Sequence, residues 1–195
     1  MTDESVHKNY KNEGGNTEYV TTYKPGLLTP IPRIEQRSAL GITEETLPFE
    51  GMDFWNAFEF SWLNNKGKPE VAVAQFQVPC QSTNIIESKS LKFYLGSYSN
   101  TKFSNRAEVI SNLESDLTLA ARAPVSVTLM ASDQIQQNGL GVLMGQSMDH
   151  LDIDADEYYW NPDFLKVESD TIVSDAVFTH LFKSICPLSG QPDFA

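Results

Sequence analysis

Two apolar runs joined by a turn constrain the fold of this chain more than any other feature. Residues 53–63 contain four aromatic residues, all at even-numbered positions: Phe54, Phe58, Phe60 and Trp62. This alternation predicts a strand that carries all four on one face. Residues 64–69 have turn chemistry, and residues 70–78 alternate again as a returning strand. Both faces of this hairpin are partly apolar, so we expect helices on one side and a second subunit or module on the other.

Helical periodicity follows the hairpin. Residues 87–98 carry apolar side chains at helical spacing, which predicts a short helix. Asn105 followed by Glu108 is typical of a capping box, and the amphipathic stripe behind it predicts a longer helix that ends near residue 121.

Alternation returns at residues 125–131, which predicts a strand, and further strands are expected within 141–151 and around 157–166. The predicted order is therefore β-β-α-α-β-β, an α+β fold in which two helices pack on one face of an antiparallel sheet. Residues 171–186 are apolar again and predict the first strand of another module.

The composition of successive segments predicts three parts. Residues 1–22 are polar and rich in Gly and Asn, so we expect a flexible leader. Residues 23–168 form the first module. Residues 169–195 begin a second module that the chain truncates, since the strand at 171–186 has no partner within this sequence.

Charge and composition exclude several classes of protein. The 14 basic and 26 acidic side chains give a net charge of −12, so we expect no broad nucleic-acid surface. No apolar run reaches the roughly 20 residues of a membrane span, and no secretory signal opens the chain, so we expect a cytoplasmic protein without a membrane partner. Two cysteines and three scattered histidines predict neither a disulfide framework nor a metal site.

The first chemically informative stretch is residues 85–95. Glu87, Lys89 and Lys92 cluster with serines where a strand meets the start of a helix. A helix start offers free backbone N–H groups and a favourable dipole for an anion, and a carboxylate there can accept two N–H bonds from a heterocycle. The alternative is a charged and well-capped helix start.

The second informative stretch closes the chain. Cys186 ends an apolar strand, and Asp193 follows after a turn that contains Pro and Gly. An accessible thiolate can act as a nucleophile, and a nearby carboxyl group can transfer its proton. The alternative is a buried, inert cysteine. Cys80 has no acid after it, and we interpret it as structural.

Together the two stretches resemble the NADPH-dependent 7-cyano-7-deazaguanine reductases (QueF), the nitrile reductases of queuosine biosynthesis. The run from Glu87 to Tyr94, Glu-Ser-Lys-Ser-Leu-Lys-Phe-Tyr, resembles the motif that defines this family. The run from Cys186 to Asp193, Cys-Pro-x-x-Gly-Gln-Pro-Asp, resembles its catalytic segment. The resemblance extends to the tripeptide Trp62-Leu63-Asn64 and to the segment 27–33.

The resemblance implies a tunnelling fold (T-fold) and a covalent mechanism. Cys186 would attack the nitrile carbon of 7-cyano-7-deazaguanine to form a thioimide, and Asp193 would donate and relay protons. NADPH, used twice per turnover, would supply the hydrides, and no metal is implied. T-fold proteins associate through their sheet edges, so the resemblance also implies a homo-oligomer, with a dimer as the expected form.

The resemblance also assigns residues of the first motif. Ile86, Glu87 and Ser88 would hold the deazaguanine, with Glu87 reading its N–H edge, and Ser88 and Lys89 would contact NADPH. The order of the two motifs matches the long form of the family, in which two T-fold modules are joined in tandem.

Two other functions remain open at this point. A non-catalytic T-fold module that binds a purine-like ligand or serves in assembly would fit a truncated chain. A zinc-dependent T-fold cyclohydrolase would need a cluster of Cys and His ligands, which two cysteines and three scattered histidines do not offer.

Overall fold

The computed structural model of the chain describes residues 20–43, 46–131, 143–158, 161–167, 169–185 and 192–194. These residues belong to two compact units, Met1–Asn138 and Gly139–Ala195. Each unit is described by itself. The module boundary expected at residues 168 and 169 stays a prediction.

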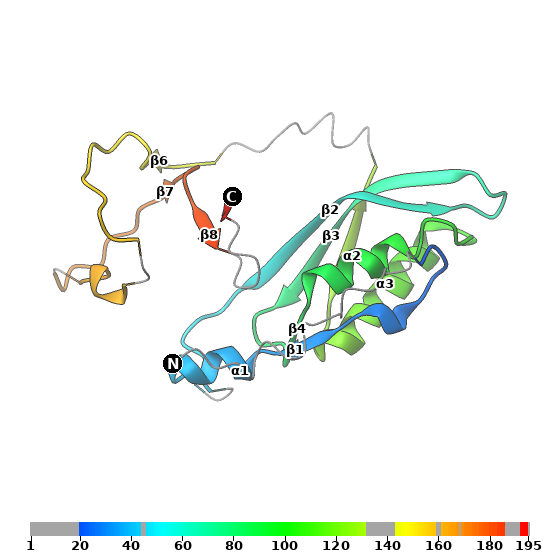
Figure 1. The fold of residues 1–195 in the computed structure, drawn as a ribbon, viewed down its shortest axis with the longest axis horizontal. Helices are drawn as coiled ribbons and strands as arrows, with labels where there is room; N and C mark the ends of the chain where they lie inside the picture. The colour runs from blue at the N-terminus through cyan, green and yellow to red at the C-terminus, as the bar shows by residue number, and fades with distance from the viewer. Residues whose placement is uncertain are drawn as a thin grey trace. The chain divides into compact units, whose positions relative to one another are not determined.

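The first unit is a mixed α+β structure with antiparallel sheets. Its strands are β1 (Pro30–Pro32), β2 (Met52–Leu63), β3 (Pro69–Pro79), β4 (Asn84–Ile86) and β5 (Ser126–Met130). Its helices are α1 (Ile34–Arg37), α2 (Ser88–Gly96) and α3 (Arg106–Ala121), with 3-10 turns at Pro25–Leu27 and Ser38–Leu40. A three-stranded sheet runs in the order β2-β3-β5, and α2 and α3 cover one of its faces (Figure 1).

The predicted hairpin is confirmed, and its turn has a local cause. The side chain Oδ1 of Asn64 accepts hydrogen bonds from the backbone N–H groups of Lys66 (3.0 Å) and Lys68 (3.1 Å). Gly67 has a φ of 82°, a left-handed conformation that glycine adopts without steric cost. The turn therefore follows from the residue types that the sequence places between the strands.

A β-bulge interrupts the hairpin in its middle. Ala57 pairs with Ala74 and Phe60 pairs with Ala72, so two residues of β2 lie opposite the single residue Val73 of β3. Because side chains alternate with a period of two, one extra residue moves every later side chain to the other face. The prediction that the four aromatic residues share one face is therefore wrong: Phe58 is 75% exposed, whereas Phe60 is 2% exposed.

The core lies between the sheet and the two helices. Its members are apolar side chains from β2, β3, β5, α2 and α3 that are almost fully buried, and the largest are Phe60, Trp62, Phe76, Tyr94 and Tyr98. The amphipathic stripe predicted for the long helix is confirmed, since Val109, Leu113 and Leu117 are at most 1% exposed.

The predicted start of α3 is confirmed with one change in its capping. The Asn105 side chain accepts from the backbone N–H of Glu108 at 3.0 Å, as an N-cap residue does. The Glu108 carboxylate accepts from the N–H of Ser104 at 2.7 Å, one residue before the N-cap.

An extended strap, residues 20–33, lies along the edge of this unit. Its strand β1 pairs antiparallel with β4, and Arg33 anchors its end through an ion pair with Asp53 and a hydrogen bond to the Ser82 hydroxyl. Arg37 of α1 donates to the carbonyl oxygen of Cys80 at 2.7 Å. The strap therefore holds the loop between β3 and β4 in place.

A partly buried cluster of hydroxyl groups ties the strap to α2 and α3. The hydroxyls of Tyr23 and Tyr94 donate to one carboxylate oxygen of Asp116, at 2.6 and 2.7 Å, and the hydroxyl of Tyr98 lies 2.7 Å from that of Tyr94. Burial, and then the hydrogen bond to Asp116, raises the pKa of Tyr23 to about 12. Burial also raises the pKa values of Tyr94 and Tyr98. All three side chains are therefore neutral at physiological pH.

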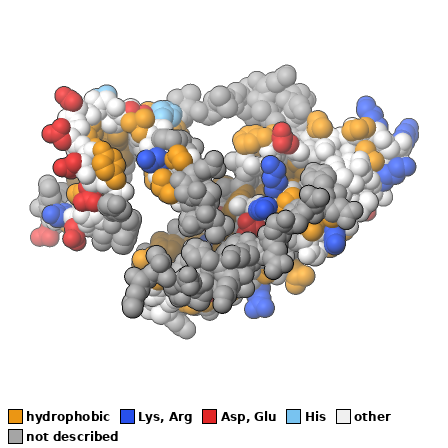
Figure 2. Space-filling view, viewed as in Figure 1, with side chains coloured by type: hydrophobic (Ala, Val, Ile, Leu, Met, Phe, Trp, Pro, Cys, Tyr) orange, Lys and Arg blue, Asp and Glu red, His pale blue; other side chains and the backbone are white. Residues whose placement is uncertain are grey.

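The second unit contains short elements: β6 (Gln146–Ser147), β7 (Val177–Phe178), β8 (Lys183–Ile185), β9 (Pro192–Phe194) and a 3-10 turn at Pro162–Phe164. Strands β6 and β7 pair in parallel, and β8 and β9 pair antiparallel. Figure 2 shows acidic side chains gathered on this unit.

Three expectations for the second unit differ from what is observed. The segment 171–186, expected to have no partner strand within the sequence, contains β7 and β8, which pair with β6 and β9. The strand expected within 141–151 is β6 in its described part, and β6 pairs with β7 instead of extending the sheet at β5. The extended piece expected around 157–166 contains a 3-10 turn, where Pro162 restricts the backbone. Among the helices that the described residues form, none is long and apolar enough to cross a membrane.

The bulge predicts opposite consequences for two aromatic residues of β2. Phe60→Ala removes a buried ring and should lower the free energy of unfolding by about 3–5 kcal/mol. Phe58→Ala should change it by less than about 0.5 kcal/mol, because its ring is exposed. Urea unfolding of both variants measures the difference. Similar losses for the two would show that they share one face.

The raised pKa of Tyr23 predicts a loss of stability in alkali. Between pH 10 and about 12 the unfolded chain releases the Tyr23 proton while the folded chain keeps it, so the free energy of unfolding falls as pH rises. Urea midpoints measured across this range should fall less steeply for Tyr23→Phe than for the wild type. Parallel curves would mean that Tyr23 titrates alike in both states.

Candidate active site

The segment that joins β4 to α2 is the best-defined candidate site. The backbone N–H of Glu87 donates to the carbonyl oxygen of Thr29 at 2.9 Å, and the N–H of Thr29 donates to the Ser90 hydroxyl at 3.0 Å. These bonds join the start of α2 to the strap. The position of Glu87 therefore depends on a contact between segments far apart in the sequence.

The Glu87 carboxylate caps α2. Its Oε1 accepts from the backbone N–H of Lys89 at 2.9 Å, and its Oε2 accepts from the N–H of Ser90 at 2.6 Å. Both interpretations of this stretch therefore involve the same carboxylate, since a capping carboxylate still has lone pairs on each oxygen for a ligand. Glu87 is half-buried, which leaves that carboxylate within reach of a bound molecule.

The same geometry corrects one expectation. The start of α2 was expected to offer free backbone N–H groups to an anion, but the Glu87 carboxylate takes those of Lys89 and Ser90. An anionic ligand bound here would therefore depend on side-chain cations rather than on these two backbone groups.

The other residues predicted for this site differ in exposure. Ile86 is 6% exposed and its side chain packs in the core. A ligand could therefore contact its backbone but not its side chain. Ser88 and Lys89 are exposed, and the Lys89 ammonium lies 5.9 Å from the centre of the Phe93 ring. The four consecutive residues 86–89 thus lie together at the start of α2, but the exposure of their side chains differs.

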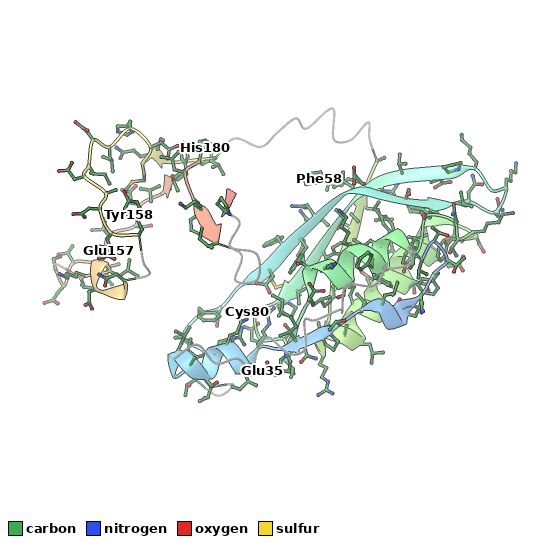
Figure 3. The ribbon with its side chains drawn as sticks, in the orientation of Figure 1. Glu35, Phe58, Cys80, Glu157, Tyr158 and His180 are labelled. Atoms are coloured by element: carbon green, nitrogen blue, oxygen red, sulfur yellow. The ribbon has the colours of Figure 1, made fainter. Side chains whose placement is uncertain are left out.

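A groove of about 490 Å³ lies beside this segment, between α2 and the bulged part of β2. Its walls include Trp55, Phe58 and Phe60 from β2, and Ser88, Leu91 and Lys92 from α2. Figure 3 labels Phe58 on β2. The sequence assigned neither Trp55 nor Phe58 to a site, because no glycine or proline indicates the bulge at residues 58 and 59 that alters this part of β2.

The two residues of the second motif belong to the other unit. Cys186 lies outside the described residues. Asp193 lies in β9, where it pairs with Ser184 across the β8–β9 ladder. Their predicted catalytic roles therefore stay predictions.

Cys80 has the environment expected of a structural cysteine. It directly follows β3, is 6% exposed, and its Sγ is 3.9 Å from the carbonyl oxygen of Phe49 (Figure 3). Burial keeps this thiol away from dissolved substrates. No group of three or more Asp, Glu, His or Cys side chains in the described part of the chain could hold a metal ion.

The capping role of Glu87 can be measured apart from any ligand. Glu87→Ala removes both acceptors at the start of α2 and should lower the free energy of unfolding by about 1 kcal/mol. Glu87→Ser restores a good N-cap acceptor and should recover most of that loss. Chemical denaturation of the two variants tests this, and equal stability of Glu87→Ala and wild type would contradict it.

Comparison with known protein families places most of the first unit in one family. The model of the family described as nitrile reductase, 7-cyano-7-deazaguanine reductase, N-terminal domain, matches residues 19–129. The match covers the strap, the hairpin, the helices α1 to α3 and most of β5, and it includes the segment around Glu87. It extends over more than half of the chain. The chain therefore belongs to the 7-cyano-7-deazaguanine reductase family of nitrile reductases.

Proposed function

We propose that this protein reduces the nitrile of 7-cyano-7-deazaguanine to the 7-aminomethyl product, with NADPH as reductant and Cys186 as nucleophile. The observation that carries the proposal is the Glu87 segment, a half-buried carboxylate held at a helix start beside a groove, within the part of the chain that matches the family. Its product serves queuosine biosynthesis.

Substrate recognition rests on the first motif. The free lone pairs of Glu87 accept hydrogen bonds from the N–H edge of the deazaguanine, and its two backbone partners hold the carboxylate in one orientation. Ser88 offers an exposed hydroxyl beside it, and Ile86 contributes through its backbone. A ligand edge with two donors matches an acceptor with two oxygens.

Covalent capture belongs to Cys186. Its thiolate adds to the nitrile carbon, a C–S bond forms, one π bond of the nitrile breaks, and the nitrogen takes a proton. Asp193 donates that proton. The first hydride converts the thioimide to an imine and releases the thiolate, and the second hydride with one further proton yields the amine, so the reaction consumes two hydrides and two protons in all.

The residues at the start of α2 fit a nucleotide cofactor, since Ser88 and Lys89 are exposed on the surface beside Glu87. NADPH supplies the hydrides when it is bound. In this proposal Ser88 and Lys89 bind and orient it, and Ser88 thus contacts both ligands.

The protein works as a homo-oligomer, because β2 is an edge strand of its sheet whose outer face carries exposed apolar side chains such as Phe54 and Phe58.

The test of the proposal is covalent capture. We expect the protein, mixed with 7-cyano-7-deazaguanine without NADPH, to gain the mass of the nitrile on Cys186. Cys186→Ala should gain no mass, since the nucleophile is absent, and should still bind the substrate in a calorimetric titration. Intact mass and peptide mapping locate the adduct.

Two further variants sharpen this test. Cys80→Ala is the matched control. It should form the adduct as the wild type does, because the Cys80 thiol that it removes is buried and does not react. Glu87→Ser retains the helix cap and should lose substrate affinity by tenfold or more, as expected when ligand donors lose a carboxylate partner. An adduct that persists in Cys186→Ala would contradict the assignment of the nucleophile.

A further inference from the structure

Another pocket of the first unit lies between α1 and the loop that joins β3 to β4. Its volume is about 260 Å³, and its polar lining consists of Arg33, Arg37, Gln81, Ser82 and Thr83. Among the described residues, none lines both this pocket and the groove between β2 and α2. A ligand held here would therefore occupy a site separate from the one proposed for the nitrile.

Two arginine side chains give this pocket its charge. Arg33 precedes α1 with helical backbone dihedrals, so it lies one helical turn from Arg37. A guanidinium group stays protonated under all physiological conditions. No Asp or Glu is found among the described residues that line the pocket. The pocket is therefore locally cationic in a chain whose net charge is −12.

The two arginines differ in their partners. Arg33 donates through Nη2 to the Asp53 carboxylate and through Nε to the Ser82 hydroxyl at 2.9 Å, so Asp53 offsets its charge within the fold. Arg37 donates through Nη2 to the carbonyl oxygen of Cys80 at 2.7 Å. Of the carboxylates in the described part of the chain, none lies within 4.0 Å of the Arg37 guanidinium. Arg37 therefore keeps a positive charge for a ligand to neutralise.

Several donors along the pocket have no partner within the described structure. They are Nη1 of Arg33, Nε and Nη1 of Arg37, the Thr83 hydroxyl and the Gln81 amide group. The Arg33 side chain is only 11% exposed, yet no buried side-chain nitrogen or oxygen of the described residues lacks a partner. Its Nη1 is therefore open to solvent, and the pocket that Arg33 lines is where that solvent lies.

A fixed positive charge and free donors on two walls of a small pocket fit an oxyanion. Guanidinium groups bind phosphate through paired N–H bonds, and donors from the opposite wall can reach the other oxygens of a tetrahedral anion. We propose that this pocket binds a phosphate group, with Arg37 as its charge partner. The free donors of Arg33, Gln81 and Thr83 complete the contacts.

A phosphate in this pocket would join two segments of the chain. Arg33 and Arg37 belong to the end of the strap and to α1, whereas Gln81 and Thr83 belong to the loop between β3 and β4. A ligand that binds both segments only in the folded chain raises the stability of that chain by mass action. Phosphate should therefore stabilise the protein as well as bind to it.

Calorimetric titration of the whole chain with inorganic phosphate, at an ionic strength kept constant with sodium chloride, tests the proposal. Arg37→Gln should weaken binding roughly 10- to 100-fold, as expected for the loss of a charge-assisted hydrogen bond. Arg37→Lys should recover part of this loss, because an ammonium group keeps the charge but not the paired donors. Lys66→Gln, the same charge change on the exposed β2–β3 turn, is the matched control and should bind as the wild type does.

A second variant separates binding from folding. Thr83→Val removes a hydroxyl that bonds to no described residue, so the free energy of unfolding should change by less than about 0.5 kcal/mol. Phosphate affinity should still fall about 2- to 10-fold, as expected for one neutral hydrogen bond. Phosphate should raise the urea midpoint of the wild type more than that of Arg37→Gln. If Arg37→Gln does not fold, the affinity of Thr83→Val decides the question.

Two further anions define the ligand. Acetate, which is planar and carries one charge, should bind more weakly than phosphate at the same ionic strength. Glycerol 3-phosphate identifies the source of the phosphate group: tighter binding than that of phosphate indicates a phosphorylated small molecule, and weaker binding indicates the free ion. Absence of phosphate binding by the wild type, equal affinity in Arg37→Gln, or acetate that binds as tightly as phosphate would overturn the inference.

Discussion

The extra residue in β2 determines the arrangement of the first unit. Before the bulge the odd-numbered residues Trp55 and Ala57 face the helices, and after it the even-numbered Phe60 and Trp62 do so. Without that shift, one half of the strand would direct its largest side chains away from the core. The same bulge places Phe58 and Glu59 along the rim of the groove. Packing and the candidate site thus depend on one irregularity of the ladder.

Much of the fold could be predicted from local signals. The hairpin, the start of α3 at Asn105, and α2 followed directly from turn residues, capping residues and periodicity. The bulge could not, because neither Phe58 nor Glu59 has a backbone preference that marks one. The β1–β4 pairing could not either, since Pro30 and Pro32 interrupt the alternation and the partner strand lies far along the chain.

The candidate site shows a similar division. Local pattern was sufficient to find the carboxylate at the start of α2, because capping and ligand recognition both favour an acceptor there. It was not sufficient to separate Lys89 from Lys92, since both are basic residues of one short motif. Their separation required the position of β2, which determines the side of α2 that forms a groove. Which lysine meets the groove is therefore a property of tertiary packing.

The bond from Glu87 to Thr29 has a dynamic consequence. The strap is held by scattered hydrogen bonds, including those from Tyr23 and Lys24 to hydroxyls of Thr101 and Ser97, and the start of α2 shares that support through Ser90. Segments joined in this way open together rather than singly in native-state fluctuations. Departure of the strap would release the Glu87 backbone from its fixed position, so the lifetime of the docked strap bounds how long the first motif stays ordered for a ligand.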